Sequence, residues 1–431
     1  MFDPIAYINE PRWQTVSLGL ERTRELLHAL GDPQDRLCFV HVAGTNGKGS
    51  TCALCASILE QAGYRVGLFT SPELYRFEDR LRVNDAAITI EELRDITLHV
   101  KDAADAMNGH PTEFEFLTAV AFCYFERSAC DIVVMEVGLG GRLDSTNVIR
   151  TAEVSVITPI SFDHCSLLGS TLAEIAGEKA GIIKRGVPVV SAPQELEVRE
   201  VIEEAALDAQ SLLMEVAISQ LEGTTEHFSY RERAGLSLGL SGSFQLVNAA
   251  TALDTIDMLK TTGWDVPERA IREGLRLASW PGRFEIVSEE PLIIFDGGHN
   301  VSGMDALSQA LNDRYPSHLR IVLTGVLADK DHAGIAKRLA QFADEVITIT
   351  PPNPRALSAQ DYACELQRLM DADTRERSVI AASDIASGVQ CALESYRALR
   401  ATQNSPLICV CGSLYMLGSV MEVLRQADLV L

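Results

Sequence analysis

Seven consecutive residues early in the chain carry the groups that a phosphate-binding turn needs. They are Gly44, Thr45, Asn46, Gly47, Lys48, Gly49 and Ser50. Glycines let backbone N–H groups turn inward toward an anion, and the N-terminus of a following helix adds positive potential. Lys48 can reach the outer phosphates of a nucleotide, and a nearby hydroxyl can serve a magnesium ion. We predict that all seven bind the phosphates of a nucleotide.

The spacing differs from the common nucleotide loop, G-x-x-x-x-G-K-[ST], because Gly49 separates Lys48 from Ser50. The alternative interpretation is a helix-capping turn with an exposed lysine. The flanking residues favour the nucleotide site. An apolar run that starts at Leu37 predicts a buried strand before the turn, and residues 51–61 predict a helix after it.

Polar side chains also stand at the ends of three further predicted strands. Ser71 follows the strand at 65–70, Glu136 lies near the end of the strand at 131–137, and His164 follows the strand at 154–159. In an open parallel sheet, ligand groups gather at the carboxyl ends of the strands. A carboxylate at the end of a buried strand is costly unless it is paired or binds a metal. We predict a magnesium site of Ser71, Glu136 and His164; the alternative is a structural role for the carboxylate and the imidazole.

Apolar runs alternate with helical segments in both halves of the chain. Helices at 112–127, 171–184 and 245–260 and a strand at 187–192 complete the first series, and residues 213–243 read as an antiparallel excursion. A second series has strands at 292–296, 319–326, 345–350, 377–381 and 406–411. We therefore predict an α/β protein with two domains. Residues 1–288 form a P-loop-type domain with a mostly parallel sheet, and residues 289–431 form a smaller Rossmann-like α/β domain.

Net charge, hydrophobic runs and cysteine distribution exclude several classes of protein. A formal net charge of −23 argues against a nucleic-acid partner or an anionic membrane surface. No apolar run is long enough to span a bilayer, and the first residues lack the features of a signal peptide, so we expect a cytoplasmic protein. The ten cysteines are scattered without zinc spacing, which favours reduced packing residues.

Six ordered segments together resemble one enzyme family. They are the G-T-N-G-K-G-S loop, S-P-E-L at 71–74, E-V-G-L-G-G-R-L-D at 136–144, D-H with L-G at 163–169, E-K-A-G-I at 178–182 and D-G-G-H-N at 296–300. The set resembles the Mur ligase superfamily, and most closely the dihydrofolate synthase and folylpolyglutamate synthase family. The family usually has a histidine in place of Glu73. The resemblance implies an ATP- and Mg²⁺-dependent ligase that adds L-glutamate to dihydropteroate and to reduced folates through an acyl phosphate.

The resemblance also implies residue roles. The loop at 44–50 would bind ATP together with Asn248, Arg283 and Asp296. Lys48, Lys179 and His299 would be catalytic, and Lys179 would carry a carbamate. His299 and Ser413 would bind glutamate. Dihydropteroate or folate would be bound by Gly19, Leu20, Glu21, Arg22, Thr112, Leu143, Asp144 and Ser145. The alternative interpretation places Lys179 on a solvated helix face.

Three other functions remain open at this point. The chain could be a ligase that only extends folates, another amino-acid-adding ligase of the superfamily, or a regulatory ATPase without a ligase step. In each ligase case the partners are small molecules. We expect a monomer.

Overall fold

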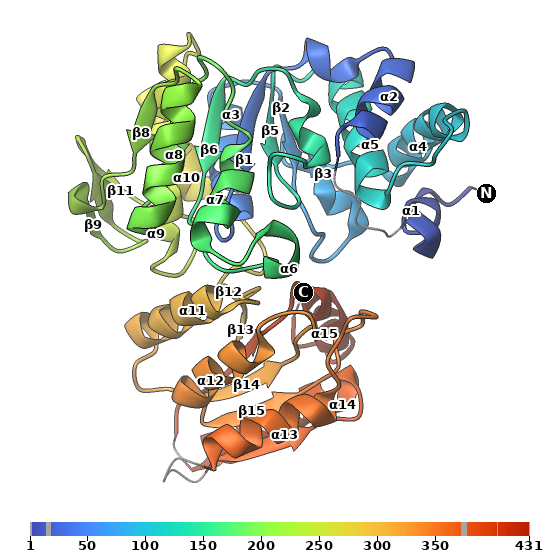
Figure 1. Ribbon diagram of the computed structural model, residues 1–431. Helices are drawn as coiled ribbons and strands as arrows, with labels where there is room; N and C mark the ends of the chain where they lie inside the picture. Colours follow the sequence, from blue (N-terminus) through green and yellow to red (C-terminus); the bar gives the residue numbers. More distant parts are fainter. Residues whose placement is uncertain (1, 14–18, 372–376, 403, 431) are drawn as a thin grey trace. The chain divides into compact units, whose positions relative to one another are not determined.

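The computed structural model describes residues 2–13, 19–371, 377–402 and 404–430, and the chain divides into two compact units (Figure 1). The first unit contains residues 1–239 and 245–279, and the second contains residues 240–244 and 280–431. The boundary expected between residues 288 and 289 falls inside strand β12 (Glu285–Glu289). That strand pairs with β13 (Leu292–Phe295) of the second unit, so the change of unit lies at Trp280 instead.

The first unit is built on an eight-stranded sheet. Its strand order is β4 (Ala86–Ala87), β3 (Leu81–Val83), β2 (Val66–Phe69), β5 (Ile132–Glu136), β1 (Phe39–Ala43), β6 (Val154–Ile157), β7 (Val189–Ser191) and β8 (Leu213–Glu215). The strands β2, β5, β1, β6, β7 and β8 pair in parallel with their neighbours. At one edge of the sheet β3 pairs antiparallel with β2, and β4 pairs antiparallel with β3. The predicted mostly parallel sheet is confirmed.

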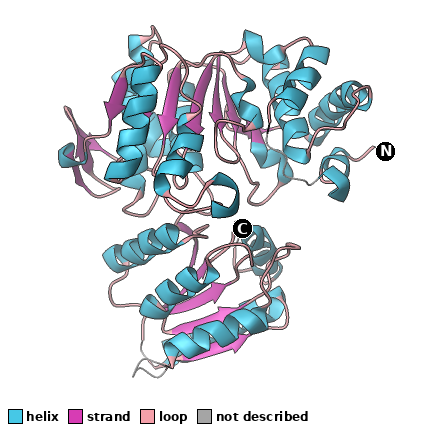
Figure 2. Cartoon of the chain, in the orientation of Figure 1, coloured by secondary structure: helices cyan, strands magenta, loops and turns pink. Residues whose placement is uncertain are grey.

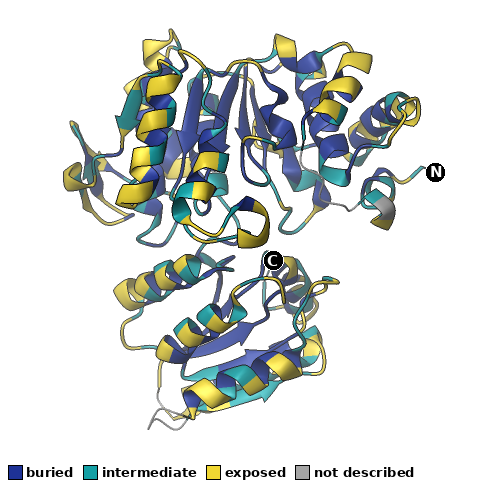
Figure 3. Ribbon diagram, in the orientation of Figure 1, coloured by how far each residue is buried: buried dark blue, intermediate teal, exposed yellow. Residues whose placement is uncertain are grey.

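Helices lie on both sides of this sheet (Figure 2). They are α1 (Pro4–Ile8), α2 (Glu21–Ala29), α3 (Lys48–Gln61), α4 (Ile90–Asp105), α5 (Glu113–Arg127), α6 (Cys165–Leu168), α7 (Leu172–Ala180), α8 (Leu196–Asp208), α9 (Gln245–Thr261) and α10 (Glu268–Leu277). The central strands are buried along their whole length, as parallel strands covered on both faces must be (Figure 3). Phe39 of β1 and the aromatic side of α5 share one core cluster.

Two segments differ from the sequence-based expectation. Residues 213–215 form β8 of the parallel sheet, and the antiparallel excursion is limited to β9 (Leu221–Gly223), β10 (Phe228–Tyr230) and β11 (Arg233–Leu236). Helix α7 ends at Ala180 rather than at Lys184, because Gly181 caps it and the chain turns toward β7.

The second unit has a six-stranded sheet in the order β12, β13, β17 (Pro406–Cys411), β14 (Leu319–Thr324), β15 (Glu345–Thr348) and β16 (Ser378–Ala381). All its strands are parallel except β12. Its helices are α11 (Val301–Arg314), α12 (His332–Phe342), α13 (Ala359–Met370), α14 (Ile385–Ala401) and α15 (Leu414–Gln426). This confirms the predicted smaller Rossmann-like domain. Among the described residues, no helix combines the length and the hydrophobicity that a membrane span requires.

One ionisable side chain lies in the centre of the first sheet. His41 of β1 is fully buried, and its Nε2 lies 3.0 Å from Thr146 Oγ1. Burial, and to a lesser degree the positive charge of Lys184, lower the pKa of His41 from 6.5 to about 3. The folded protein therefore holds a neutral imidazole at pH values where the unfolded chain is protonated.

This difference predicts a pH dependence of stability. As pH falls through 6.5, the unfolded chain gains a proton at His41 that the folded chain does not, so stability decreases. Between pH 7 and pH 5 the loss from this one group is about 2 kcal/mol. His41→Gln should remove that part of the slope in urea unfolding, and His99→Gln, at an exposed histidine, should leave it. Equal pH slopes in the wild type and His41→Gln would contradict this account.

Candidate nucleotide and ligand site

Four neighbouring parallel strands bring the predicted site segments to one edge of the first sheet. Strands β2, β5, β1 and β6 are adjacent in that order. Their carboxyl ends lead to Ser71, to Glu136 and its glycine-rich turn, to the loop at 44–50, and to the segment at 161–164. Sequence alone placed these groups at strand ends, and the strand order makes them neighbours.

The phosphate loop is held by contacts that only glycine permits. Gly47 has φ +85° and caps the start of α3, which begins at Lys48 rather than at residue 51. A Cβ atom on Gly47 would lie 2.3 Å from Asn248 Oδ1, and one on Gly44 would lie 1.8 Å from Thr158 Oγ1. A side chain at either position would therefore displace the loop from β6 or from α9.

Backbone and hydroxyl groups fix the loop to the end of β6. The N–H groups of Thr45 and Asn46 donate to the Pro159 carbonyl oxygen at 3.0 and 3.2 Å. The Thr45 hydroxyl donates to the Ser161 carbonyl oxygen at 3.0 Å. Behind the loop, Gln245 of α9 donates to Ser50 Oγ at 3.3 Å and accepts from Asn248. The loop and the first turn of α3 are thus positioned before any ligand binds.

Two lysines converge on one carbonyl of this loop. Lys48 is half-buried, and its Nζ donates to the carbonyl oxygens of Gly44 and Thr45 at 3.2 and 3.1 Å. Lys179 of α7 is buried, and its Nζ donates to the same Gly44 oxygen at 2.8 Å. The interpretation of Lys179 as part of a solvated helix face is therefore wrong. Lys48 places a positive charge at the loop, where a phosphate group would approach.

The predicted metal ligands are partly brought together. Glu136 is buried at the end of β5, and its Oε2 accepts the N–H of Ser71 at 3.1 Å. His164 precedes α6 with φ +51°, and its Nε2 lies 3.9 Å from Asp163 Oδ1. Among the residues that the structure describes, no group of three His, Cys, Asp or Glu side chains has a metal-binding arrangement. The oxygen donors of Glu136 and Ser71 nevertheless suit Mg²⁺, which takes few protein ligands and keeps several waters.

The predicted folate segments meet through a residue that sequence analysis missed. Glu115 is buried and accepts two hydrogen bonds from the Arg22 guanidinium, at 2.8 and 3.0 Å. It also accepts the N–H of Thr112, whose hydroxyl caps α5. These bonds therefore link the N-terminus of α2 to the N-terminus of α5. Gly19, Leu20 and Glu21 precede Arg22 directly in the chain. The capping-box spacing Thr112-x-x-Glu115 could have indicated that Glu115 lies at the N-terminus of α5.

The turn after β5 carries the other predicted folate residues. Asp144 is buried, with one carboxylate oxygen accepting from the Leu139 N–H and the other from the N–H and hydroxyl of Thr146. Burial raises the pKa of its carboxyl group. Ser145 Oγ lies 2.9 Å from Thr118 Oγ1 of α5, and Leu143 is partly exposed. The hydrogen bonds of Asp144 therefore hold the backbone of the turn in place, and Leu143 is partly exposed on it.

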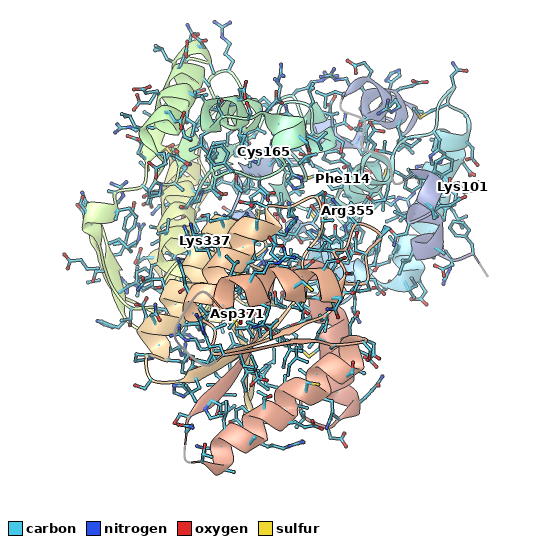
Figure 4. The ribbon with its side chains drawn as sticks, turned by 60° about the horizontal axis from the view of Figure 1, so that its bottom comes forward. Lys101, Phe114, Cys165, Lys337, Arg355 and Asp371 are labelled. Atoms are coloured by element: carbon cyan, nitrogen blue, oxygen red, sulfur yellow. The ribbon has the colours of Figure 1, made fainter. Side chains whose placement is uncertain are left out.

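Aromatic packing joins the same turn to α5. Phe114, labelled in Figure 4, lies over Gly138, where a Cβ atom would be 2.4 Å from the ring. Nearby, the buried Arg80 pairs with Glu113 of α5 at 2.9 Å and with Glu73 at 3.4 Å. Glu73, which departs from the family pattern, thus gains a cationic partner.

The second unit places its predicted site residues at the carboxyl ends of β13 and β17. Asp296 is buried and accepts the N–H groups of Phe284 and Gly298 at 2.9 and 2.8 Å. Burial raises its pKa, against the opposing effect of the positive charge of Arg283. The Arg283 guanidinium lies directly on Gly297, since a Cβ atom there would be 1.7 Å from it. His299 Nδ1 lies 2.9 Å from the Gly297 carbonyl oxygen.

Ser413 lies beside this segment. It follows β17, the neighbour of β13, and is buried at the N-terminus of α15. The preceding Gly412 donates its N–H to the Gly298 carbonyl oxygen at 3.0 Å. Arg283, Asp296, His299 and Ser413 thus lie around one pair of strand ends.

Comparison with known proteins identifies the class. Residues 42–256 match the Mur ligase middle domain, and residues 282–414 match the Mur ligase glutamate ligase domain. The first match lies in the first unit except for residues 240–244, and the second match lies in the second unit. They define an ATP-dependent ligase of the Mur class.

Individual relatives narrow the class to a family. The chain is 37% identical to folylpolyglutamate synthase of Lacticaseibacillus casei, over 98% of each chain, and 37% identical to dihydrofolate synthase/folylpolyglutamate synthase of Bacillus subtilis, over 95% of this chain and 96% of that one. Its fold matches Escherichia coli FolC in complex with DHPP and ADP, with TM-score 0.84, 32% identity and coverage of 98% and 97%. The chain belongs to the dihydrofolate synthase/folylpolyglutamate synthase family.

The packing of Gly47 generates a prediction with an internal control. Gly47 and Gly63 both have left-handed backbone, φ +85° and +95°, but a Cβ atom meets Asn248 only at Gly47 and meets nothing within 4 Å at Gly63. Gly63→Ala should cost about 1 kcal/mol of stability for its backbone alone. Gly47→Ala should cost about 1–3 kcal/mol more, because the buried amide must move. Urea unfolding measures both, and equal losses would show that the loop tolerates a side chain.

Proposed function

We propose that this chain adds L-glutamate to the carboxylate of dihydropteroate and of reduced folates, using ATP. The observation that carries the proposal is the convergence of Lys48 and Lys179 on the Gly44 carbonyl in a phosphate loop. The relatives named dihydrofolate synthase/folylpolyglutamate synthase, which match the chain almost end to end, support the choice of substrates.

The chemical task explains the need for a phosphate loop. A carboxylate is a poor electrophile, so its oxygen first attacks the γ-phosphorus of ATP, which gives an acyl phosphate and ADP. The glutamate amine then attacks the acyl carbon, and phosphate leaves with the former carboxylate oxygen. Phosphoryl transfer depends mainly on positioning and on neutralising charge. In this proposal Gly44 to Ser50 hold the phosphates and Lys48 neutralises the transferred group.

Ser71, Glu136 and His164 are the proposed Mg²⁺ residues. A bound Mg²⁺ would neutralise negative charge on the nucleotide phosphates. The Ser71–Glu136 contact supports two of the three residues, and family resemblance alone supports His164. In the first unit Asn248, against Gly47, completes the proposed nucleotide contacts.

In the second unit we assign Arg283 and Asp296 to the nucleotide, and His299 and Ser413 to glutamate. A guanidinium beside a buried carboxylate suits a phosphate or ribose group. His299 and Ser413 lie at the ends of adjacent strands, where an amino acid would find both an imidazole and a helix N-terminus.

The acceptor would bind along the linked N-termini of α2 and α5. Gly19, Leu20, Glu21, Arg22 and Thr112 form one side, and Leu143, Asp144 and Ser145 form the other. The hydrogen bond between Ser145 and Thr118 supports this grouping because it joins the turn to α5. The two reactions differ only in the length between ring and reacting carboxylate, so one catalytic centre can serve both.

A substrate-omission assay tests the ligase directly. Phosphate release should require ATP, glutamate and an acceptor together, with dihydropteroate and a reduced folate each sufficient as acceptor. Lys48→Ala should lower the rate at least about a hundredfold, because charge at the transferred phosphate is lost. Lys101→Ala, at a half-buried lysine of α4 that pairs with Asp105, should not change it.

The outcomes of this assay separate the alternatives. Phosphate release without acceptor would indicate a regulatory ATPase. Turnover of reduced folate but not of dihydropteroate would indicate an enzyme that only extends folates. Turnover only with a uridine-linked acceptor would indicate another ligase of the superfamily.

We also propose that Lys179 carries a carbamate. Two ammonium groups at the Gly44 carbonyl repel each other, whereas a carbamate on Lys179 would attract Lys48. Lys179→Ala and the more nearly isosteric Lys179→Met should both lower turnover, and added acetate should partly restore only the alanine variant, which has room for it. Native mass spectrometry of fully active protein that shows unmodified Lys179 would rule the carbamate out.

A further inference from the structure

A pocket lies in the first unit, away from the phosphate loop. It has a volume of about 540 Å³ and is lined by Arg24 and His28 of α2, by Asp32 and Gln34, by residues 147–150, and by Lys184. The segments that line it lead into the amino ends of β1, β6 and β7. Because these strands are parallel, the pocket lies at the sheet edge opposite the Lys48 loop. In Figure 1, α2 and α6 mark these two edges.

The pocket holds two cations that no carboxylate neutralises. Lys184 Nζ donates to Asn147 Oδ1 at 2.6 Å and to the Asn147 carbonyl oxygen at 3.4 Å, which are both neutral acceptors. Within the described ranges, the Arg24 guanidinium has no ion-pair partner. Burial and the positive charge of Arg24 lower the pKa of Lys184 to about 8. In a chain with net charge −23, such a pair stands out.

The one carboxylate in the pocket is already paired. Asp32 accepts from His28 Nδ1 at 3.0 Å and from Gln34 Nε2 at 3.2 Å, and these bonds lower its pKa. Among the described residues its ion-pair partner is His28, and no ion pair joins it to Arg24 or Lys184. Arg150 also lines the pocket, and its guanidinium lies 3.3 Å from Asp35.

A buried acceptor and an apolar wall complete the pocket. Gln34 is more than nine-tenths buried, and its Oε1 has no hydrogen-bond partner among the described residues. Val148 and Ile149 supply apolar surface. The volume is within the range of small-molecule sites.

We propose that this pocket is a second ligand site, which binds a small organic anion. Its phosphate or carboxylate head pairs with Arg24 and Lys184, and the rest of the molecule lies against Val148 and Ile149. The site does not overlap the residues assigned to ATP, glutamate or folate. The proposal stands without the ligase function, because it concerns binding alone.

Calorimetric titration of the full chain tests the site. The probes are ribose 5-phosphate for a phosphate head and succinate for a carboxylate head, each with ADP present to occupy the nucleotide loop. At least one probe should bind at millimolar concentration. Arg24→Gln and Lys184→Met should each weaken it at least about tenfold, because each removes a charge-assisted hydrogen bond.

A matched variant provides the control. Arg185 is next to Lys184 but pairs with Gln210 at the surface and does not line the pocket, so Arg185→Gln should bind like the wild type. Because Lys184 also holds Asn147, thermal unfolding should confirm that Lys184→Met is folded. If it is not, Arg24→Gln decides the question, since Arg24 is exposed. No binding of either probe, or binding unchanged in Arg24→Gln, would overturn the proposal.

Discussion

Close packing around two glycines is the constraint on which the site depends. Gly44 lies against Thr158 at the end of β6, and Gly47 lies against Asn248 of α9, at separations that leave no room for a Cβ atom. Two loop amides also donate to the Pro159 carbonyl oxygen. The loop is therefore clamped between a strand end and a helix, so its N–H groups and the start of α3 need little ordering when an anion binds. Preorganisation of this kind is what phosphoryl transfer requires.

The remaining groups are positioned relative to that loop. The carbonyl of Gly44 is the shared acceptor of Lys48 and Lys179, so α7 is tied to the loop through a single buried lysine. Gly141 lies so close to the backbone of Lys179 that a Cβ atom would be 2.9 Å from its carbonyl oxygen. The turn that carries Leu143 and Asp144 is thereby joined to α7. The first-unit residues that we assign to the nucleotide phosphates and to the acceptor are thus joined by direct contacts.

Much of the fold and of the candidate site was predictable from the local pattern of apolar and polar residues. The apolar runs predicted the parallel strands, and the polar residues that follow those runs predicted the segments of the candidate site. The start of α3 was misplaced because left-handed Gly47, rather than the first apolar residue, caps the helix. The insertion of β5 between β2 and β1 depends on long-range pairing, which no local pattern encodes. The Arg22–Glu115 pair was missed for the same reason, since its partners lie far apart in sequence. The domain boundary was predicted after residue 288 rather than at Trp280 because the antiparallel pairing of β12 with β13 was not foreseen.

The central claim is that ATP activates the acceptor carboxylate at this site. The most direct measurement uses a reduced folate with both oxygens of the reacting carboxylate labelled with ¹⁸O, together with ATP and glutamate. If an acyl phosphate forms, one labelled oxygen leaves with phosphate, so the released phosphate gains a single ¹⁸O per amide bond. Phosphate without label, while labelled folate is converted to its glutamate adduct, would contradict the account.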